Sequence, residues 1–194
     1  MPPKIINDEQ YEFWNEGIGK KWVQEDASMN ERFTILTDEF FSRTMINKDD
    51  SILDIGCGGG ITSYEASKLV GENGYVLGAD ISEILLDLAK KNYSSIKNLE
   101  FKYCDVQNYE FEKKIFNKVI SRFGVMFFEN PIEAFKNISN SIQDGGSLHF
   151  VCWADVMENE FFTLSVNIII NYLKKDFPEI TRAPGPFAFS EEDY

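Results

Sequence analysis

The segment "ILDIGCGGG", residues 52–60, holds residue types that point to ligand binding. Asp54 lies in a short apolar run, and glycines follow at positions 56, 58, 59 and 60. Glycine lets the backbone approach a ligand closely, because it has no side chain to hold the ligand off. A tight turn from a strand into a helix would also use glycine, but it would need fewer of them. We therefore predict that this segment is a binding loop.

The spacing of these glycines narrows the class of ligand. A dinucleotide-binding loop would need glycines at positions 56, 58 and 61, and position 61 is isoleucine. The arrangement that fits is an acid followed by alternate glycines, Asp54-x-Gly56-x-Gly58-x-Gly60. The loop therefore differs from the pyrophosphate-binding loop of dinucleotide enzymes.

Two more aspartates follow apolar runs further along the chain. Asp80 ends "YVLGAD" and Asp105 ends "LEFKYCD". A single aspartate in such a place is commonly a turn residue or a helix cap. A carboxylate at a strand end can also accept hydrogen bonds from both hydroxyls of a ribose. Because the two acids would lie at successive strand ends, together they predict a nucleoside pocket.

The elements that must position these residues alternate along the chain. Apolar runs predict strands at 51–55, 75–80, 99–105, 117–123 and 147–153, and amphipathic segments predict helices at 61–70, 83–92 and 131–142. This alternation is typical of a doubly wound α/β fold, in which crossover helices cover a mostly parallel sheet. The aspartates would then meet at the carboxyl edge of the sheet.

The whole chain, 1–194, is expected to form a single domain in three parts. Residues 1–48 are dense in aromatics and acids and predict a helical cap with a break at Gly17 to Gly19, and 49–153 form the α/β core. Residues 154–194 predict a substrate-side segment, with a helix over 158–177 and another that begins at Ser190. The stretch 161–173 is apolar on most sides, which fits either the core or the wall of a substrate pocket.

The glycine spacing and the two downstream acids resemble the motifs of class I S-adenosylmethionine-dependent methyltransferases. The resemblance implies that the loop passes under the methionyl part of the cofactor and that Asp54 helps to hold its ammonium group. It also implies that Asp80 binds the ribose and Asp105 the adenine amino group, with the backbone N–H of Val106 facing the ring. The implied cofactor contacts are Asp54, Gly56, Cys57, Gly58, Gly60, Asp80, Ile81, Asp105, Val106, Ser121 and Phe123.

Four further segments are similar to the ubiquinone-type branch of small-molecule methyltransferases. They are "WNEGIGKKW" (14–22), "SRFGVMFFENP" (121–131), "GGSLHFVCW" (145–153) and "PGPFAF" (184–189). The resemblance implies the strand order 3-2-1-4-5 followed by two more strands, and the sequence offers no candidates for strands six and seven. We therefore expect this chain to be the front part of a longer protein. If the chain exists as written, its fifth strand would present an open edge that favours a homodimer, aggregation or partial unfolding.

Composition restricts the partners and the location. The formal net charge is −13, and the lysines are scattered in doublets, so a nucleic-acid backbone is not the expected substrate. Three cysteines without metal-type or redox-type spacing predict neither a disulfide framework nor a metal site, which fits a reducing cytoplasm. The longest apolar stretch is too short to span a bilayer, so we expect no membrane span.

Methyl transfer would need no dedicated acid or base if the acceptor is already ionised. S-adenosylmethionine carries an activated methyl group, and the protein has to align it in line with the acceptor atom. The sequence names no catalytic residue, because the single histidine, His149, lies in a buried-strand pattern. The expected activity is methyl transfer to a small, apolar metabolite.

Two other functions stay open at this point. The first is an NAD-dependent oxidoreductase, which Ile61 and the position of the Tyr64–Lys68 pair disfavour, because that pair follows the glycine loop directly. The second is a cofactor-binding fragment without turnover, which the missing strands favour.

Overall fold

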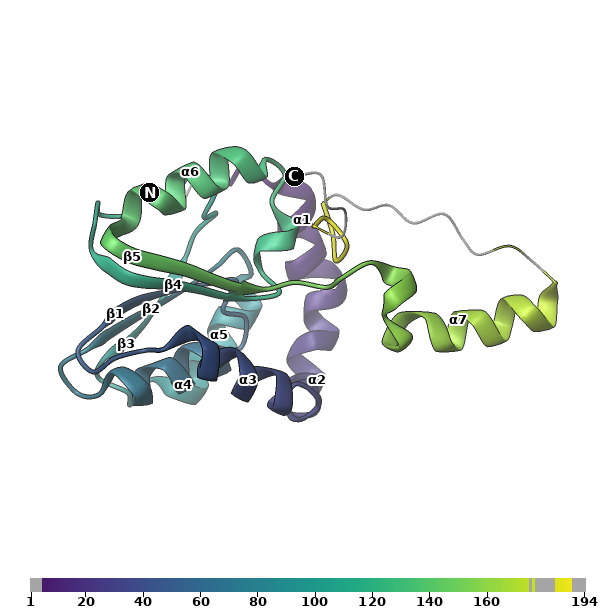
Figure 1. Ribbon diagram of the computed structural model, residues 1–194, viewed down its shortest axis with the longest axis horizontal. Helices are drawn as coiled ribbons and strands as arrows, with labels where there is room; N and C mark the ends of the chain where they lie inside the picture. Colours follow the sequence, from purple (N-terminus) through teal and green to yellow (C-terminus); the bar gives the residue numbers. More distant parts are fainter. Residues whose placement is uncertain (1–4, 175, 177–183, 190–194) are drawn as a thin grey trace.

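A five-stranded parallel sheet forms the centre of the protein. The computed structural model describes residues 5–174, 176 and 184–189. The strands are β1 Ser51–Ile55, β2 Tyr75–Asp80, β3 Leu99–Tyr103, β4 Phe116–Arg122 and β5 Ile142–Val151. Their order is β3-β2-β1-β4-β5 (Figure 1), which confirms the predicted doubly wound α/β fold and its strand order. The central β1 pairs with β2 and β4, so Asp54 lies opposite Gly78 on one side and Ile120 on the other.

Helices cover both faces of this sheet, as Figure 1 shows with α6 on one side and α3, α4 and α5 on the other. The helices of the core are α4 Ile61–Val70, α5 Glu83–Tyr93 and α6 Pro131–Ser141. One apolar cluster joins Leu53 and Val119 to Ala134 and Ile138 of α6, whereas Ile52 packs in the second cluster with α3 and α4. Burial of alternate β1 side chains on opposite faces fixes the register of this strand and places its carboxyl end.

The N-terminal cap is helical from Asp8 to Thr44 with one short turn before α3. It consists of α1 Asp8–Glu12, a π-helical turn Phe13–Gly17, α2 Ile18–Arg32 and α3 Thr34–Thr44. The predicted break at Gly17 to Gly19 is present only as the change from π-helix to α-helix. A Cβ at position 19 would lie 1.7 Å from the carbonyl oxygen of Trp14, so the tight turn requires glycine there.

Two strand boundaries differ from the prediction. β3 ends at Tyr103, so Asp105 lies in the loop after the strand. β5 begins at Ile142, where the sequence predicts the end of a helix, and "DGG" is part of β5 instead of a turn before it. The β4–β5 register shifts between Phe116 and Lys118, and this irregularity accommodates the extra residues of β5.

The C-terminal segment leaves the sheet. It holds a short 3-10 helix Val156–Glu158 and α7 Glu160–Leu173, which projects away from the sheet in Figure 1. The helix predicted over 158–177 is therefore confirmed up to Leu173, but Thr163 is its only buried residue, so the stretch 161–173 is not core. Residues 184–189 pack back onto the core, where the N–H of Gly185 donates to Met126 O. The helix predicted from Ser190 lies outside the described residues.

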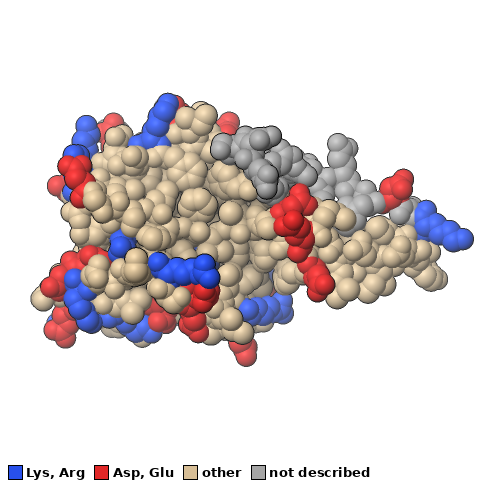
Figure 2. Space-filling model, in the orientation of Figure 1, with Lys and Arg blue, Asp and Glu red and all other residues tan. Residues whose placement is uncertain are grey.

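Charges are mixed over the surface that Figure 2 shows: lysine and arginine stand among aspartate and glutamate and do not form a stripe. In the described part of the chain, no helix is both long and apolar enough to cross a bilayer, and no group of three metal-ligand side chains occurs.

Candidate functional site

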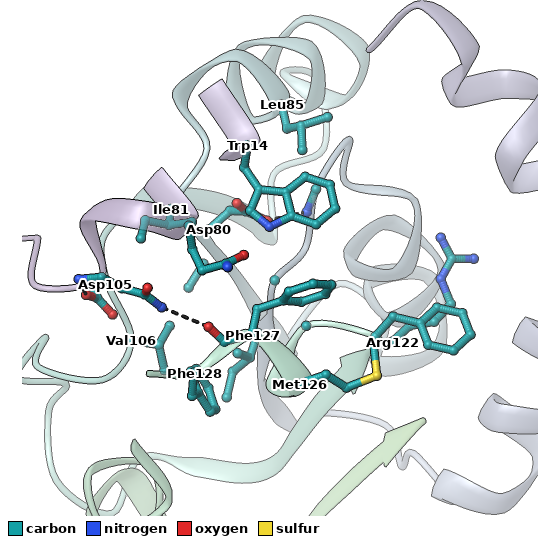
Figure 3. Close-up of a pocket in the computed structure, with 18 of the residues that line it drawn as sticks. Trp14, Asp80, Ile81, Leu85, Asp105, Val106, Arg122, Met126, Phe127 and Phe128 are labelled. Carbon is teal, nitrogen blue, oxygen red and sulfur yellow. Dashed lines mark hydrogen bonds between the residues drawn. The ribbon is translucent and has the colours of Figure 1, made fainter. Parts of the chain in front are cut away.

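A cavity of about 160 Å³ lies at the carboxyl ends of β1, β2 and β4, under the N-terminal helices (Figure 3). Asp80 and Asp105 lie on one side of it, and Arg122 lies on the opposite side. We call the side with Asp80 and Asp105 the acidic end, and the side with Arg122, Phe123 and Trp153 the arginine end. Further lining residues are Asn7, Gln10, Trp14, Trp22, Ile55, Gly56, Gly58, Ala79, Ile81, Leu85, Cys104, Val106, Gly124, Met126, Phe127 and Phe128.

The glycine loop follows β1 directly. Gly56 has φ +66°, a backbone conformation that favours glycine. A Cβ at position 56 would lie 2.7 Å from the Cα of Gly124, so the loop and the turn after β4 cross too closely for a side chain. The N–H of Gly56 donates to Ala79 O at 2.8 Å, which ties the loop to the end of β2. The loop is therefore held by backbone contacts to the two neighbouring strands.

Asp54 lies fully buried under this loop. Its Oδ2 accepts hydrogen bonds from the hydroxyls of Thr62 and Ser63, both at 2.6 Å, while Oδ1 has no partner among the described residues. Burial raises the pKa of the carboxyl to about 6. The unpartnered Oδ1 is an acceptor that a cationic donor at the glycine loop would satisfy. Thr62 and Ser63 were missed by the sequence analysis, although two hydroxyls at the start of the following helix were a signal.

Asp80 joins the glycine loop to the helix after β2. Its Oδ2 accepts from the N–H of Gly58 at 2.7 Å and its Oδ1 from the N–H of Ser82 at 2.8 Å. Its pKa is raised, because burial outweighs these backbone hydrogen bonds. Each carboxylate oxygen can accept a further hydrogen bond, so Asp80 keeps capacity toward the cavity that it lines.

Asp105 holds the beginning of the described chain. Its Oδ2 accepts from the N–H groups of Ile6 and Asn7, both at 3.1 Å, and its Oδ1 accepts from the N–H of Gln107 at 3.0 Å. The side chain of Asn7 also donates to Phe127 O at 2.8 Å, the dashed line in Figure 3. The segment around Asn7 thus closes the acidic end, and Asp105 is shared between this closure and the cavity.

The two residues predicted after β4 have different places. Ser121 is fully buried: its Oγ donates to Ile55 O at 2.8 Å and accepts from the N–H of Gly124, so it joins β1 to the turn after β4. Phe123 lines the cavity with φ +67°, and its ring stacks on Trp153 at 4.7 Å with an interplanar angle of 9°.

The structure thus brings part of the predicted contact set to the cavity. The residues that line it are Gly56, Gly58, Asp80, Ile81, Asp105, Val106 and Phe123. The residues that do not line it are Asp54, Cys57, Gly60 and Ser121.

Arg122 is the charged lining residue that the sequence analysis missed. Its Nη1 donates to Thr37 Oγ1 at 2.7 Å and its Nη2 to Asn30 Oδ1 at 3.0 Å. Its guanidinium lies 5.9 Å from the centre of the Phe33 ring. The available signal was an arginine inside an otherwise apolar run at a strand end.

Aromatic rings close the cavity from the N-terminal side. The ring of Trp14 lies 5.6 Å from that of Trp22 and 5.3 Å from that of Phe127, both edge-on. The side-chain oxygen of Gln10, also a lining residue, is buried without a partner among the described residues. The tryptophans therefore belong to the cavity wall as well as to the packing of the cap.

His149 is not part of this site. Its Nε2 lies 2.8 Å from Ser147 Oγ, and burial, followed by the charge of Lys118, lowers its pKa. The titratable lining residues in the described part of the chain are Asp80, Cys104, Asp105 and Arg122. Burial raises the pKa of Cys104 to about 12, and both aspartates already accept hydrogen bonds from backbone N–H groups. Among the described lining residues, the arginine end holds no carboxylate, thiol or imidazole that could act as a base.

Comparison with known proteins identifies the family of the chain. Residues 46–180 match the family described as "Methyltransferase domain". Protein 235L of Invertebrate iridescent virus 6 is 33% identical over 157 residues, which are 80% of this chain and 55% of that protein. The demethylmenaquinone methyltransferase of Staphylococcus aureus is 30% identical over 77% of this chain and 59% of its own length.

A solved structure shares the fold. The S-adenosylmethionine-dependent methyltransferase of Aquifex aeolicus superposes with a TM-score of 0.58 and 17% identity, covering 70% of this chain and 77% of that one. This chain spans between 55% and 59% of the length of the two curated relatives. Because the matched family covers more than half of its residues, the chain belongs to the class I S-adenosylmethionine-dependent methyltransferases.

Proposed function

We propose that the protein transfers a methyl group from S-adenosylmethionine to a small, apolar acceptor by in-line displacement. The observation that carries the proposal is the position of the glycine loop between two buried carboxylates. One is Asp54, whose Oδ1 lacks a partner, and the other is Asp80, which lines the cavity. A ligand with a cationic amino acid at one end and a ribose at the other fits this pair.

Different residues of the cavity would contact the methionyl, ribose and adenine parts of the cofactor. The loop at Gly56 and Gly58 would lie against the methionyl part. The ionised carboxylate of Asp54, which lies beneath the loop and outside the cavity lining, would attract its ammonium group. Asp80 would accept from the ribose hydroxyls with its remaining lone pairs. The adenine would lie among apolar side chains at the acidic end, between Ile81 and Val106, with Asp105 beside it.

Bound S-adenosylmethionine supplies the activated methyl group, and the protein supplies alignment and a dry environment. Holding two reactants in line can lower a barrier by roughly 7–11 kcal/mol, so positioning alone is a sufficient source of rate. The rings of Trp14, Phe127 and Trp153 line the cavity and would exclude water from the reacting centre once the cofactor is bound. Asn7 and Gln10 cover the cavity from the N-terminal side.

Equilibrium binding tests the proposal. Isothermal titration of the whole chain with S-adenosylhomocysteine should give saturable binding with one site, and titration with NAD should give none. Binding of NAD without S-adenosylhomocysteine would overturn the proposal in favour of an oxidoreductase. Incubation with methyl-labelled S-adenosylmethionine and a cell extract should then label a small molecule, whereas binding without label transfer would indicate a binding module.

A further inference from the structure

Arg122 places a permanent positive charge in an apolar part of the cavity. In the described part of the chain, no carboxylate lies within ion-pair distance of its guanidinium. Asp54 and Asp26 act on it only through longer-range attraction, and burial lowers its pKa. A buried charge without a paired counter-ion is costly, so the arrangement is complete only when an anion joins it.

The guanidinium is held in place and still has donors to offer. Thr37 and Asn30 accept one hydrogen bond each, and a guanidinium carries five N–H groups. Asn30 is in turn fixed by Asp26, because its Nδ2 donates to Asp26 Oδ2 at 3.1 Å. Arg122 is therefore oriented by α2 and α3, and its remaining N–H groups suit the two oxygens of a carboxylate or a single oxyanion.

The surroundings of Arg122 fit the body of an acceptor better than they fit the cofactor. Its guanidinium donates hydrogen bonds to the cap helices α2 and α3. The neighbouring rings are those of Phe33, Phe123 and Trp153, whose centroids lie 4.7–6.0 Å from one another. Figure 3 shows Arg122 across the cavity from Asp105, at the far side from the acidic end. An apolar wall with one cation at its edge recognises an apolar molecule with one negative group.

The lack of a base at the arginine end points to the same class of acceptor. A neutral phenol, acid or ketone would have to lose a proton before or during methyl transfer. The described residues of the arginine end, Arg122, Phe123 and Trp153, include no group that could take it, whereas an acceptor that arrives ionised needs no base.

We infer that Arg122 binds the methyl acceptor, an inference that rests on the methyl transfer proposed above. The acceptor would be an apolar molecule that carries one oxyanion, which is a carboxylate, a phenolate or an enolate. In the transfer, an electron pair of the anionic acceptor forms the bond to the methyl carbon. The bond from that carbon to sulfur breaks, and its pair stays on sulfur. The sulfonium and the anion are neutralised together, so no proton or further reactant is needed.

The test compares two probes of the same shape. Benzoate and benzamide are titrated into the whole chain saturated with S-adenosylhomocysteine, and binding is followed by tryptophan fluorescence, because Trp153 lines the arginine end. Hydrogen bonds to a charged group predict that benzoate binds about tenfold tighter than benzamide or more. Arg122→Met should abolish this preference, and Arg122→Lys should retain part of it. Arg43→Met, an equal change at an exposed arginine of α3, should leave it unchanged.

Three results would overturn the inference. The first is a benzoate preference that survives in Arg122→Met, and the second is no benzoate binding to the unmodified protein at millimolar concentration. The third is loss of S-adenosylhomocysteine binding in Arg122→Met while 5′-methylthioadenosine, which lacks the amino acid, still binds, because Arg122 would then serve the cofactor's carboxylate. If the unmodified chain binds no S-adenosylhomocysteine, the proposed function itself fails, which distinguishes the two failures.

Discussion

At the acidic end of the cavity the carboxylates are held by backbone N–H groups, whereas at the arginine end the guanidinium is held by side chains of the N-terminal helices. Asp80 accepts hydrogen bonds from the backbone N–H groups of Gly58 and Ser82, which follow the ends of β1 and β2 by three residues or fewer. Arg122 donates to Asn30 and Thr37, which are 92 and 85 residues away in the sequence. The first arrangement follows from local strand and loop geometry, and the second exists only after the cap has packed on the core.

The largest effect should come from breaking the loop at the acidic end. Gly56→Ala combines a positive φ with a Cβ 2.7 Å from Gly124 Cα, so we expect a loss of about 3 kcal/mol in the free energy of unfolding. Gly58→Ala has a similar φ but no atom within 4 Å of the new Cβ, so it should cost only about 1 kcal/mol. Chemical denaturation of both variants measures the difference, and equal losses would show that the crossing with Gly124 is not tight.

A smaller effect is expected from removing the acceptor at the same end. Asp80→Ala leaves the N–H of Gly58 unpaired and removes the proposed ribose contact, so S-adenosylhomocysteine should bind about 10- to 100-fold more weakly. Asp87→Ala, on the exposed side of α5, is the matched control and should bind like the unmodified chain. Calorimetric titration decides this, and unchanged affinity in Asp80→Ala would remove Asp80 from the proposed site.

The same difference explains what the sequence could predict. The five strands and the positions of Asp54 and Asp80 at strand ends follow from apolar runs and glycine spacing, which are local signals, whereas the strand order came from the family resemblance. Arg122 was overlooked because its role depends on Asn30 and Thr37, and no periodicity connects residues so far apart. The length of β5 was also wrong, because a strand that begins at Ile142 depends on pairing with Phe116 and not on its own sequence.

The pH dependence of cofactor binding would test the role of Asp54. Its pKa in the free protein is raised to about 6, above its unfolded value, so its contribution to stability is present at low pH and is lost as the pH rises through 6. Pairing with an ammonium group needs the ionised form, so affinity for S-adenosylhomocysteine should fall about tenfold from pH 7 to pH 5. Asp54→Asn should lack this step. Asp80, whose pKa is also raised, is unchanged in this variant, so any pH step that Asp80 contributes would remain.

If the pH step persists unchanged in Asp54→Asn, another group carries it. The prediction is specific to affinity, so each variant is first checked for a cooperative thermal transition at both pH values. Arg122 acts on the same buried carboxylate through longer-range attraction and keeps its charge throughout this range, so it does not contribute a step of its own.

The smallest effect should come from loosening the arginine end without removing the charge. Thr37→Val deletes the oxygen that accepts from Arg122 Nη1 at 2.7 Å, and a lost hydrogen bond to a charged group costs about 1.5 kcal/mol or more. Much of this cost should be recovered as Arg122 turns its freed N–H toward a bound anion, so the benzoate preference should fall only a few-fold while S-adenosylhomocysteine binding stays the same.

Thr34→Val is the matched control, because Thr34 makes the same kind of hydrogen bond to the helix backbone but is exposed and does not touch Arg122. Equal binding by the two variants would mean that Asn30 alone orients the guanidinium, and the arginine end would then depend on α2 rather than on both cap helices.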